Sequence, residues 1–208
     1  MMRGELRREQ PDWFNAPVPS FGALDARLIV VGLAPGLRGA NRTGRPFTGD
    51  YAGELLYETL LDFGFAHGRY AAAPDDGLTL ADCFITNAVR CVPPQNKPAT
   101  PEIAACRAYL RATLAAAARS EIIVALGRIA HEQVLRAAGA KLSAHPFAHG
   151  ARHGLNGPDG RPLALFDSYH CSRYNTNTGV LTRSMFREIF AAAREALSAR
   201  ASQAASIS

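Results

Sequence analysis

The stretch RLIVVG at residues 27–32, followed directly by LAPG at residues 33–36, decides the fold of this chain. Its apolar centre is rich in β-branched residues and unbroken, a pattern typical of a strand that is buried on both faces of a parallel sheet. The glycines and the proline that come next end the strand and open a loop, rich in glycine and arginine, that reaches Asp50. The pattern therefore predicts a buried strand whose carboxyl end carries a long polar loop.

Strand-like and helix-like segments alternate along the rest of the chain. Apolar runs predict three more strands, over residues 84–89, 121–126 and 162–166. Helical periodicity and end signals predict helices over residues 53–63, 100–119, 128–138 and 181–199. Residues 141–161, with four glycines and three histidines, are expected to form a loop or a short hairpin. This order predicts an α/β fold: a three-layer α/β/α sandwich with a central, mainly parallel four-stranded sheet.

Length and composition fit one domain. The chain has 208 residues, of which 48% are hydrophobic, so we expect a single domain over residues 1–208 with flexible residues at 1–12 and 200–208. The residues up to Pro19 mix charges with prolines and are expected to be irregular. A net charge of +5 is compatible with a polyanionic partner. Apolar runs such as residues 28–31 are far too short to cross a membrane, and the first residues show no signal-peptide pattern, so we expect a soluble, cytoplasmic protein.

Polar residues gather after three of the predicted strands, in residues 32–50, 87–97 and 168–179. The first of these loops is neither a Walker loop nor a dinucleotide-binding turn, because the required glycine and lysine pattern is missing. In open parallel sheets, ligands bind beyond the carboxyl ends of the strands. We therefore expect Asp50, Asn87 and His170 to share one crevice.

These three loops also carry a resemblance to a known family. The motifs GLAPG and NRTGRPFTGD (residues 32–36 and 41–50), ITNAVRCVPPQNKP (85–98) and SYHCSRYNTNTG (168–179) resemble the uracil-DNA glycosylase superfamily. The match is closest to its type 5 branch, which is related to the type 4 iron–sulfur enzymes, and it extends from about residue 13 to residue 193. The resemblance implies a monomeric DNA repair enzyme that removes uracil, and other deaminated bases such as hypoxanthine, from DNA.

The chemistry of base excision explains the residue types in these motifs. An N-glycosidase that acts on DNA must extrude its nucleotide, and then needs a flat surface for the base, a reader of its edge and a donor for the departing anion. The resemblance assigns these roles to Phe47, Asn87 and His170, with Gly32 and Leu33 in the same substrate-binding loop. Each residue also has a purely structural alternative. Phe47 could be an ordinary aromatic residue of the core, Asn87 could cap a turn, and His170 could form its hydrogen bonds within the protein at the end of a strand.

The attacking water needs a partner as well. Type 4 relatives carry an acid directly after the first glycine of their first motif, where this chain has Leu33. We expect Asp50 to position the water, with Asn41 as a second candidate. A helix cap near Ala52 is the structural alternative for Asp50.

Contacts with DNA are expected from two sets of residues. The resemblance implies that the loop with Arg173, Tyr174 and Asn175 enters the minor groove and fills the space that the extruded base leaves. Basic residues of the other loops are candidates for phosphate contacts, with a solvated surface charge as the alternative for each: Arg38, Arg42, Arg45, Arg90 and Lys97.

The resemblance also implies a [4Fe–4S] cluster held by four cysteines. Cys91 and Cys106 match the second pair of ligands, but the N-terminal pair has no counterpart in the sequence given. Cys83 and Cys171 are not placed to replace that pair. We therefore expect this chain as given to bind a cluster weakly or not at all.

Two other classes of function remain open. One is a nucleic-acid-binding module on the same fold that has lost catalysis, which the unusual Cys171 in the catalytic segment keeps open. The other is a small-molecule hydrolase with a metal at His145, His149 and His153, whose spacing of four suits helical ligands although glycines surround them.

Overall fold

The computed structural model describes residues 2–205 of the chain. Its α-helices are α1 (Met2–Glu9), α2 (Ala40–Thr43), α3 (Tyr51–Asp62), α4 (Thr100–Ala116), α5 (Arg128–Ala138), α6 (Arg173–Asn177) and α7 (Arg183–Ala205). Its strands are β1 (Phe21–Gly22), β2 (Leu28–Gly32), β3 (Ala66–His67), β4 (Thr79–Leu80), β5 (Cys83–Asn87), β6 (Ile122–Leu126), β7 (Arg152–Asn156) and β8 (Pro162–Ser168). Two short 3₁₀ helices, η1 (Pro94–Asn96) and η2 (Leu142–Ala144), complete the elements.

The central sheet has six strands in the order β1-β5-β2-β6-β8-β7. Strands β5, β2, β6 and β8 are parallel, and they are the four strands that the sequence predicts. The α/β sandwich is confirmed, but the strand number of four is wrong, because β1 and β7 pair antiparallel at the two edges. Strand β1 has only two residues, and β7 buries only Leu155, so neither leaves an apolar pattern in the sequence.

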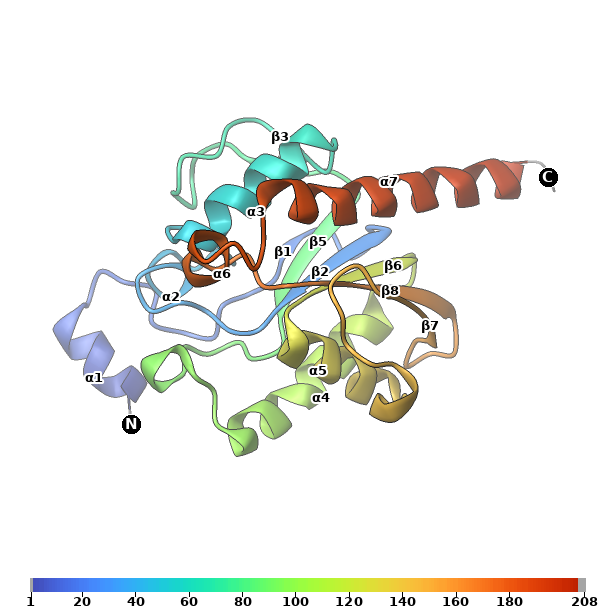
Figure 1. Cartoon of the computed structure of the whole chain (residues 1–208). Helices are drawn as coiled ribbons and strands as arrows, with labels where there is room; N and C mark the ends of the chain where they lie inside the picture. Colours follow the sequence, from blue (N-terminus) through green and yellow to red (C-terminus); the bar gives the residue numbers. More distant parts are fainter. Residues whose placement is uncertain (1, 206–208) are drawn as a thin grey trace.

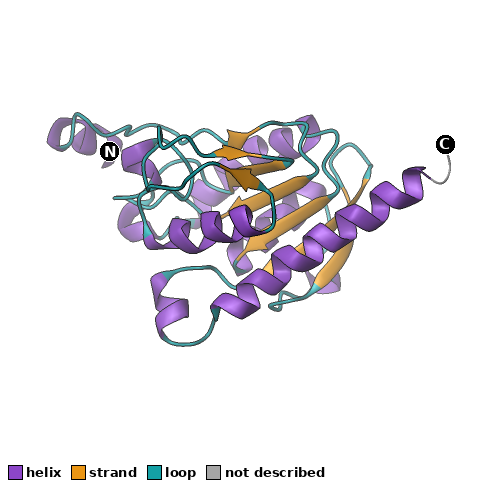
Figure 2. Ribbon diagram, turned by 90° about the horizontal axis from the view of Figure 1, so that it is seen from above, coloured by secondary structure: helices purple, strands orange, loops and turns teal. Residues whose placement is uncertain are grey.

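The two faces of β2 belong to different layers. Leu28 and Val30 pack with the apolar faces of α3 and α7, whereas Ile29 and Val31 pack with those of α4 and α5. Figure 1 shows α3 and α7 above the sheet and α4 and α5 below it. Figure 2, seen from above, shows α7 running across the strands. An unbroken apolar strand is needed because both of its faces are covered.

The chain order places a crevice at the end of β2. From β2 the chain passes to β5 on one side of the sheet, and then returns to β6 on the other side. Such a reversal of strand order opens a space beyond the carboxyl ends of the strands, where the two connections part. The loop after β2 lies at this position.

Both ends of the chain differ from the predictions. Helix α1 forms where the sequence predicts irregular structure, and the Asn15 side chain ties it down by donating to the carbonyl oxygens of Leu6 and Gln10 at 3.3 and 2.7 Å. Helix α7 continues to Ala205, six residues past its predicted end at 199. The flexibility expected for residues 1–12 and 200–208 falls partly on residues 1 and 206–208, which lie outside the described part of the chain. Within that part, no helix combines the length and apolarity that crossing a membrane requires.

A candidate active site at the carboxyl end of the sheet

A cavity of about 610 Å³ lies at this crevice. Its walls come from the loop after β2, the start of α3, the end of β5 and the segment after β8. The predicted residues that line it are Leu33, Arg38, Phe47, Asp50, Asn87, His170 and Arg173. The structure thus brings Asp50, Asn87 and His170 together, as the topology of the strands predicts, while their roles stay predictions.

Phe47 lies in an unusual conformation at the base of the cavity. Its φ is +53°, a value that is uncommon for an aromatic residue and costs about 1–3 kcal/mol. Tyr70 helps to hold it by donating its hydroxyl hydrogen to the Phe47 carbonyl oxygen at 3.2 Å. The Phe47 ring lies 6.2 Å from the His170 ring between centroids, at an angle of 30°. Strain of this kind, held by surrounding structure, is characteristic of binding sites.

Asn87 is the last residue of β5 and pairs with Gly32 of β2. Its side-chain Oδ1 is buried and has no hydrogen-bond partner among the described residues. An orphaned buried acceptor costs about 1–3 kcal/mol, so an amide in this state is suited to a ligand. Gly32 leaves room for it, because an added Cβ would lie 2.4 Å from Asn87 Oδ1 and 2.5 Å from Phe47 Cζ.

His170 follows β8 and faces the cavity. Burial lowers the pKa of its imidazole below the ordinary value of 6.5, so the ring is neutral at pH 7. Its backbone is held by Asn175, whose side-chain amide donates to the His170 carbonyl oxygen at 2.8 Å. Within the described part of the chain, neither ring nitrogen forms a hydrogen bond with protein. The ring therefore has a hydrogen to donate to a ligand.

Asp50 is both a helix cap and a wall of the cavity. One carboxylate oxygen accepts from the Gly53 N–H at 3.1 Å at the start of α3, which is the alternative role that the sequence left open. The other oxygen lies against the glycine loop, where an added Cβ at Gly39 would come within 2.4 Å of it. Burial raises the pKa of the Asp50 carboxyl, and the amides of Gly53 and Ala52 oppose that rise.

Two buried residues of the glycine-rich loop, both predicted as functional, lie outside the cavity. Asn41 is fully buried and donates from Nδ2 to Asn15 Oδ1 at 2.9 Å, so it ties the loop to the segment after α1. Arg45 is 5% exposed and forms a bidentate pair with Asp76, with both N–O distances at 2.8 Å. The expectation that Arg45 contacts phosphates is therefore wrong, because its charge is already neutralised inside the protein.

The loop after His170 forms the short helix α6 at the rim. Arg173 lines the cavity with its guanidinium 5.2 Å from the Tyr51 ring, and Tyr174 is 74% exposed. Asn175 is occupied with the His170 backbone. Tyr51 lies directly after the FTGD motif and also lines the cavity, so its position in the sequence was the signal that could have identified it.

The other basic residues differ in how far they are exposed to solvent. Arg38 and Arg42 are exposed, and Arg42 Nε donates to the Arg38 carbonyl oxygen at 2.9 Å. Lys97 is exposed as well. Arg90, by contrast, donates to the Thr113 hydroxyl at 2.8 Å and is half-buried, so it braces α4.

The cysteines do not fit a four-thiolate cluster within the described residues. Cys91 and Cys106 are half-buried, but Cys83 lies in β5 and Cys171 donates from its Sγ to the Ala52 carbonyl oxygen at 3.5 Å. Burial raises the pKa of the Cys83 and Cys171 thiols, which keeps them protonated, whereas cluster ligands are thiolates. Among the described residues, no cysteine lies in a group of three or more side chains that could hold a metal ion. The chemistry proposed below uses no cluster.

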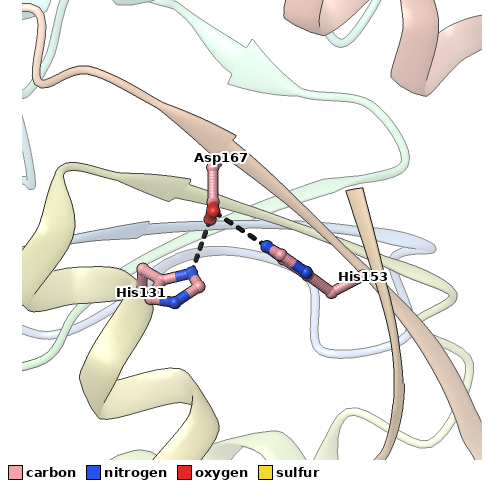
Figure 3. Close-up of side chains that lie close together, drawn as sticks. All are labelled: His131, His153 and Asp167. Carbon is pink, nitrogen blue, oxygen red and sulfur yellow. Dashed lines mark hydrogen bonds and ion pairs between the residues drawn. The ribbon is translucent and has the colours of Figure 1, made fainter. Parts of the chain in front are cut away.

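The histidine-rich loop does not assemble as its spacing suggests. His149 accepts a hydrogen bond from the Tyr169 N–H at 3.1 Å and stacks on the Tyr169 ring, apart from His145 and His153. His153 instead lies beside His131 and Asp167 (Figure 3), two residues that sequence reasoning missed.

Comparisons with known proteins agree with this geometry. The family model described as the uracil DNA glycosylase superfamily matches residues 19–194. The chain is 47% identical over 187 residues to a type-5 uracil-DNA glycosylase of Thermus thermophilus, which covers 90% of this chain and 83% of the relative. A type-5 enzyme of Pyrobaculum aerophilum is 40% identical, covering 88% of this chain and 78% of its own length. A type-4 uracil-DNA glycosylase of Saccharolobus solfataricus is 30% identical, with 88% and 77% covered.

Proposed function

This chain belongs to the uracil DNA glycosylase superfamily, and on that premise we propose that it hydrolyses the N-glycosidic bond of uracil in DNA. The similarity to type-5 enzymes over 83% and 78% of their lengths supports this activity. We extend the proposal to other deaminated bases such as hypoxanthine, and to a single domain that acts as a monomer.

Access to the cavity requires that the nucleotide leave the helix. The reactive carbon of a stacked nucleotide is hidden, so the enzyme extrudes it and spends a few kcal/mol on unstacking. The exposed Tyr174 ring on α6 enters the vacated space, beside Arg173 at the rim of the cavity. Arg38 and Arg42 contact phosphates, since both are exposed beside the glycine-rich loop. Affinity for DNA therefore falls as salt rises.

The uracil ring then lies on Phe47 with its polar edge against Asn87. The side-chain amide of Asn87 donates to the O4 atom and accepts the N3–H hydrogen, so one group reads both positions. Cytosine presents a donor and an acceptor in the opposite order, which the same amide orientation does not match. The orphaned Oδ1 of Asn87 supports this role, because uracil would supply its missing partner.

Bond cleavage sends an electron pair from the C1′–N1 bond to the base. Negative charge grows on the O2 atom of uracil, and the neutral His170 ring donates a hydrogen bond there, which stabilises the transition state more than the substrate. Water adds to the positive C1′ atom, and the Asp50 carboxylate orients it and accepts its proton. The raised pKa of Asp50 suits a carboxylate to this task, because a base closer to neutrality accepts a proton more readily.

One observation carries the proposal: a single cavity of about 610 Å³ is lined by Phe47, Asp50, Asn87 and His170. The test uses a labelled duplex with one uracil, incubated with the protein and then cleaved by hot alkali at the abasic site. We expect product from the wild type and from His67→Ala, a change at an exposed histidine on β3. We expect a large loss of product for His170→Ala. Absence of product from the wild type, or full activity of His170→Ala, would refute the proposal.

The same assay tests the wider base range. A duplex with hypoxanthine in place of uracil should also be cleaved, at a rate that falls with His170→Ala. Cleavage of the uracil duplex alone would restrict the activity to uracil.

A further inference from the structure

Three metal-binding side chains meet where α5 packs against β7 and β8. Asp167 comes from β8, His131 from α5 and His153 from β7, and their ligand atoms all lie within 4.8 Å of one another. Figure 3 shows the Asp167 carboxylate directed at both imidazoles. We propose that this cluster binds one divalent transition-metal ion of the zinc class. None of the three residues lines the active-site cavity.

The hydrogen bonds of His131 require a positive charge at this point. Its Nε2 lies 2.9 Å from the carbonyl oxygen of His145, which can only accept, so this nitrogen carries a hydrogen. In the neutral ring Nδ1 then presents a lone pair, and it lies 2.7 Å from Asp167 Oδ1. Two lone pairs at that distance repel each other, so either a proton joins these two atoms, or they move apart to hold a metal ion.

The surroundings suit a metal ion as well as a proton. A metal-bound histidine typically donates its other ring hydrogen to a backbone carbonyl, and His131 has this arrangement with His145. Asp167 uses both oxygens, since Oδ2 lies 3.1 Å from His153 Nε2. Two imidazoles and one carboxylate form a donor set that zinc prefers, and they leave a fourth position for water.

The donor atoms of the cluster lie somewhat closer together than the ligands of one ion. Tetrahedral ligation at the usual zinc distances places neighbouring donor atoms about 3.3 Å apart. The corresponding separations are 2.7 Å from Asp167 to His131 and 3.1 Å from Asp167 to His153. His131 and His153 would have to withdraw from Asp167 by about 0.6 and 0.2 Å to reach that spacing.

A second cavity gives the ion a way in. It measures about 740 Å³ and is lined by His145 and His153, while Asp167 is completely buried behind them. His145 is also a candidate for the fourth ligand. Its Nδ1 lies 2.9 Å from the Lys141 carbonyl oxygen, which leaves Nε2 with a lone pair, and its ring centroid is 5.5 Å from that of His153.

Metal binding would join three elements of the fold. The ion would tie the edge hairpin of β7 and β8 to α5, and Asp167 precedes the catalytic candidate His170 by three residues. Anything that binds the folded state alone raises its stability. Zinc should therefore raise the melting temperature of the protein without any change in the active-site cavity.

The test is a titration of the full chain. Protein dialysed against a chelator and then against buffer is titrated with Zn²⁺ by calorimetry, and thermal unfolding is followed with and without Zn²⁺. We expect one ion per chain and a rise in melting temperature. His153→Gln, a change at a side chain that is 11% exposed, should weaken binding at least tenfold.

Matched variants separate the cluster from other sites. His67→Gln removes an exposed histidine and His170→Gln removes the cavity histidine, and both should bind Zn²⁺ like the wild type. Cys91→Ser with Cys106→Ser should also leave the affinity unchanged. A wild type that takes up no Zn²⁺, or an affinity that falls with the cysteine variant and not with His153→Gln, overturns the proposal.

Cobalt provides a readout that needs no variant. Co²⁺ bound by imidazoles and a carboxylate gives visible d–d absorption without thiolate charge-transfer bands. That spectrum supports the cluster, whereas thiolate bands at one equivalent would place the ion on cysteines and overturn the proposal.

Discussion

His170 and Asp167 are three residues apart, yet their surroundings are opposite. Around His170 the polar groups lack protein partners: the Asn87 Oδ1 atom is orphaned, and among described residues the imidazole has no hydrogen-bond partner. Around Asp167 both carboxylate oxygens contact imidazole nitrogens, and His131 is bonded at both ring nitrogens. Unpaired buried groups lower stability, and paired ones rigidify. The difference indicates that the first region is built to receive a base, whereas the second holds the structure, whether a proton or a metal ion joins its side chains.

The largest expected effect is a loss of stability when the hydrogen-bonded cluster around Asp167 is broken. Asp167→Ala leaves the imidazoles of His131 and His153 without their acceptor, and we expect the free energy of unfolding to fall by about 3–5 kcal/mol. Urea unfolding in the presence of a chelator measures it. Asp75→Ala, at an exposed turn, is the control and should change stability by less than about 0.5 kcal/mol. If the free energy of unfolding falls by less than about 1 kcal/mol for Asp167→Ala, the surroundings of Asp167 and His170 do not differ in the way described.

Around His170, where the polar groups lack protein partners, a substitution should change the rate of excision instead of the stability. His170→Gln removes the donor to the leaving base, and we expect the single-turnover rate on a uracil duplex to fall about 10²–10³-fold. Stability should hardly change, because the ring has no hydrogen bond to lose within the described chain. Loss of folding together with activity would show that His170 is a structural residue after all.

Asn87→Leu sharpens the same contrast at a second residue. Excision should slow about 10–100-fold, because the edge of uracil loses two hydrogen bonds. The free energy of unfolding should stay level or rise, because the change removes an orphaned buried oxygen. The prediction requires both results in the same variant: slower excision, and a free energy of unfolding that does not fall. A clear loss of stability would count against a ligand-binding role for Asn87.

The smallest effect is on pH dependence. Because burial lowers the pKa of His170, its neutral form persists as the pH falls below 6.5, where an unfolded histidine would already be protonated. The acid limb of kcat/KM, measured at constant ionic strength, should therefore lie below pH 6.5. The lowered pKa also affects stability. Below pH 6.5 the unfolded chain binds a proton at His170 more readily than the folded protein does, so the free energy of unfolding falls as the pH falls. An acid limb at or above 6.5 that remains after Asp50→Asn, a change at the other group whose protonation slows the reaction, would show that the ring is not desolvated.

Much of the fold could be predicted because its signals are local. The buried strand over residues 28–32 and the helix that starts after Asp50 are visible as apolar runs, periodicity and a capping residue. The cavity followed from one rule, that the carboxyl ends of parallel strands meet at one edge.

The misses depend on contacts between distant residues. Arg45 looks like a surface cation until Asp76, 31 residues further along the chain, neutralises it. His131 and Asp167 are 36 residues apart and meet only because α5 packs on the sheet. No spacing rule links such pairs, and a helix of eight residues or a strand of two offers too little pattern to detect.

The most direct test of the central claim is a crystal structure with a duplex that carries an unreactive, 2′-fluorinated deoxyuridine. We predict the uracil extruded into the cavity, with its ring against Phe47 and its edges within about 2.7–3.2 Å of the Asn87 amide and the His170 ring. A uracil bound elsewhere on the protein, or one that contacts only one of these three side chains, would contradict it.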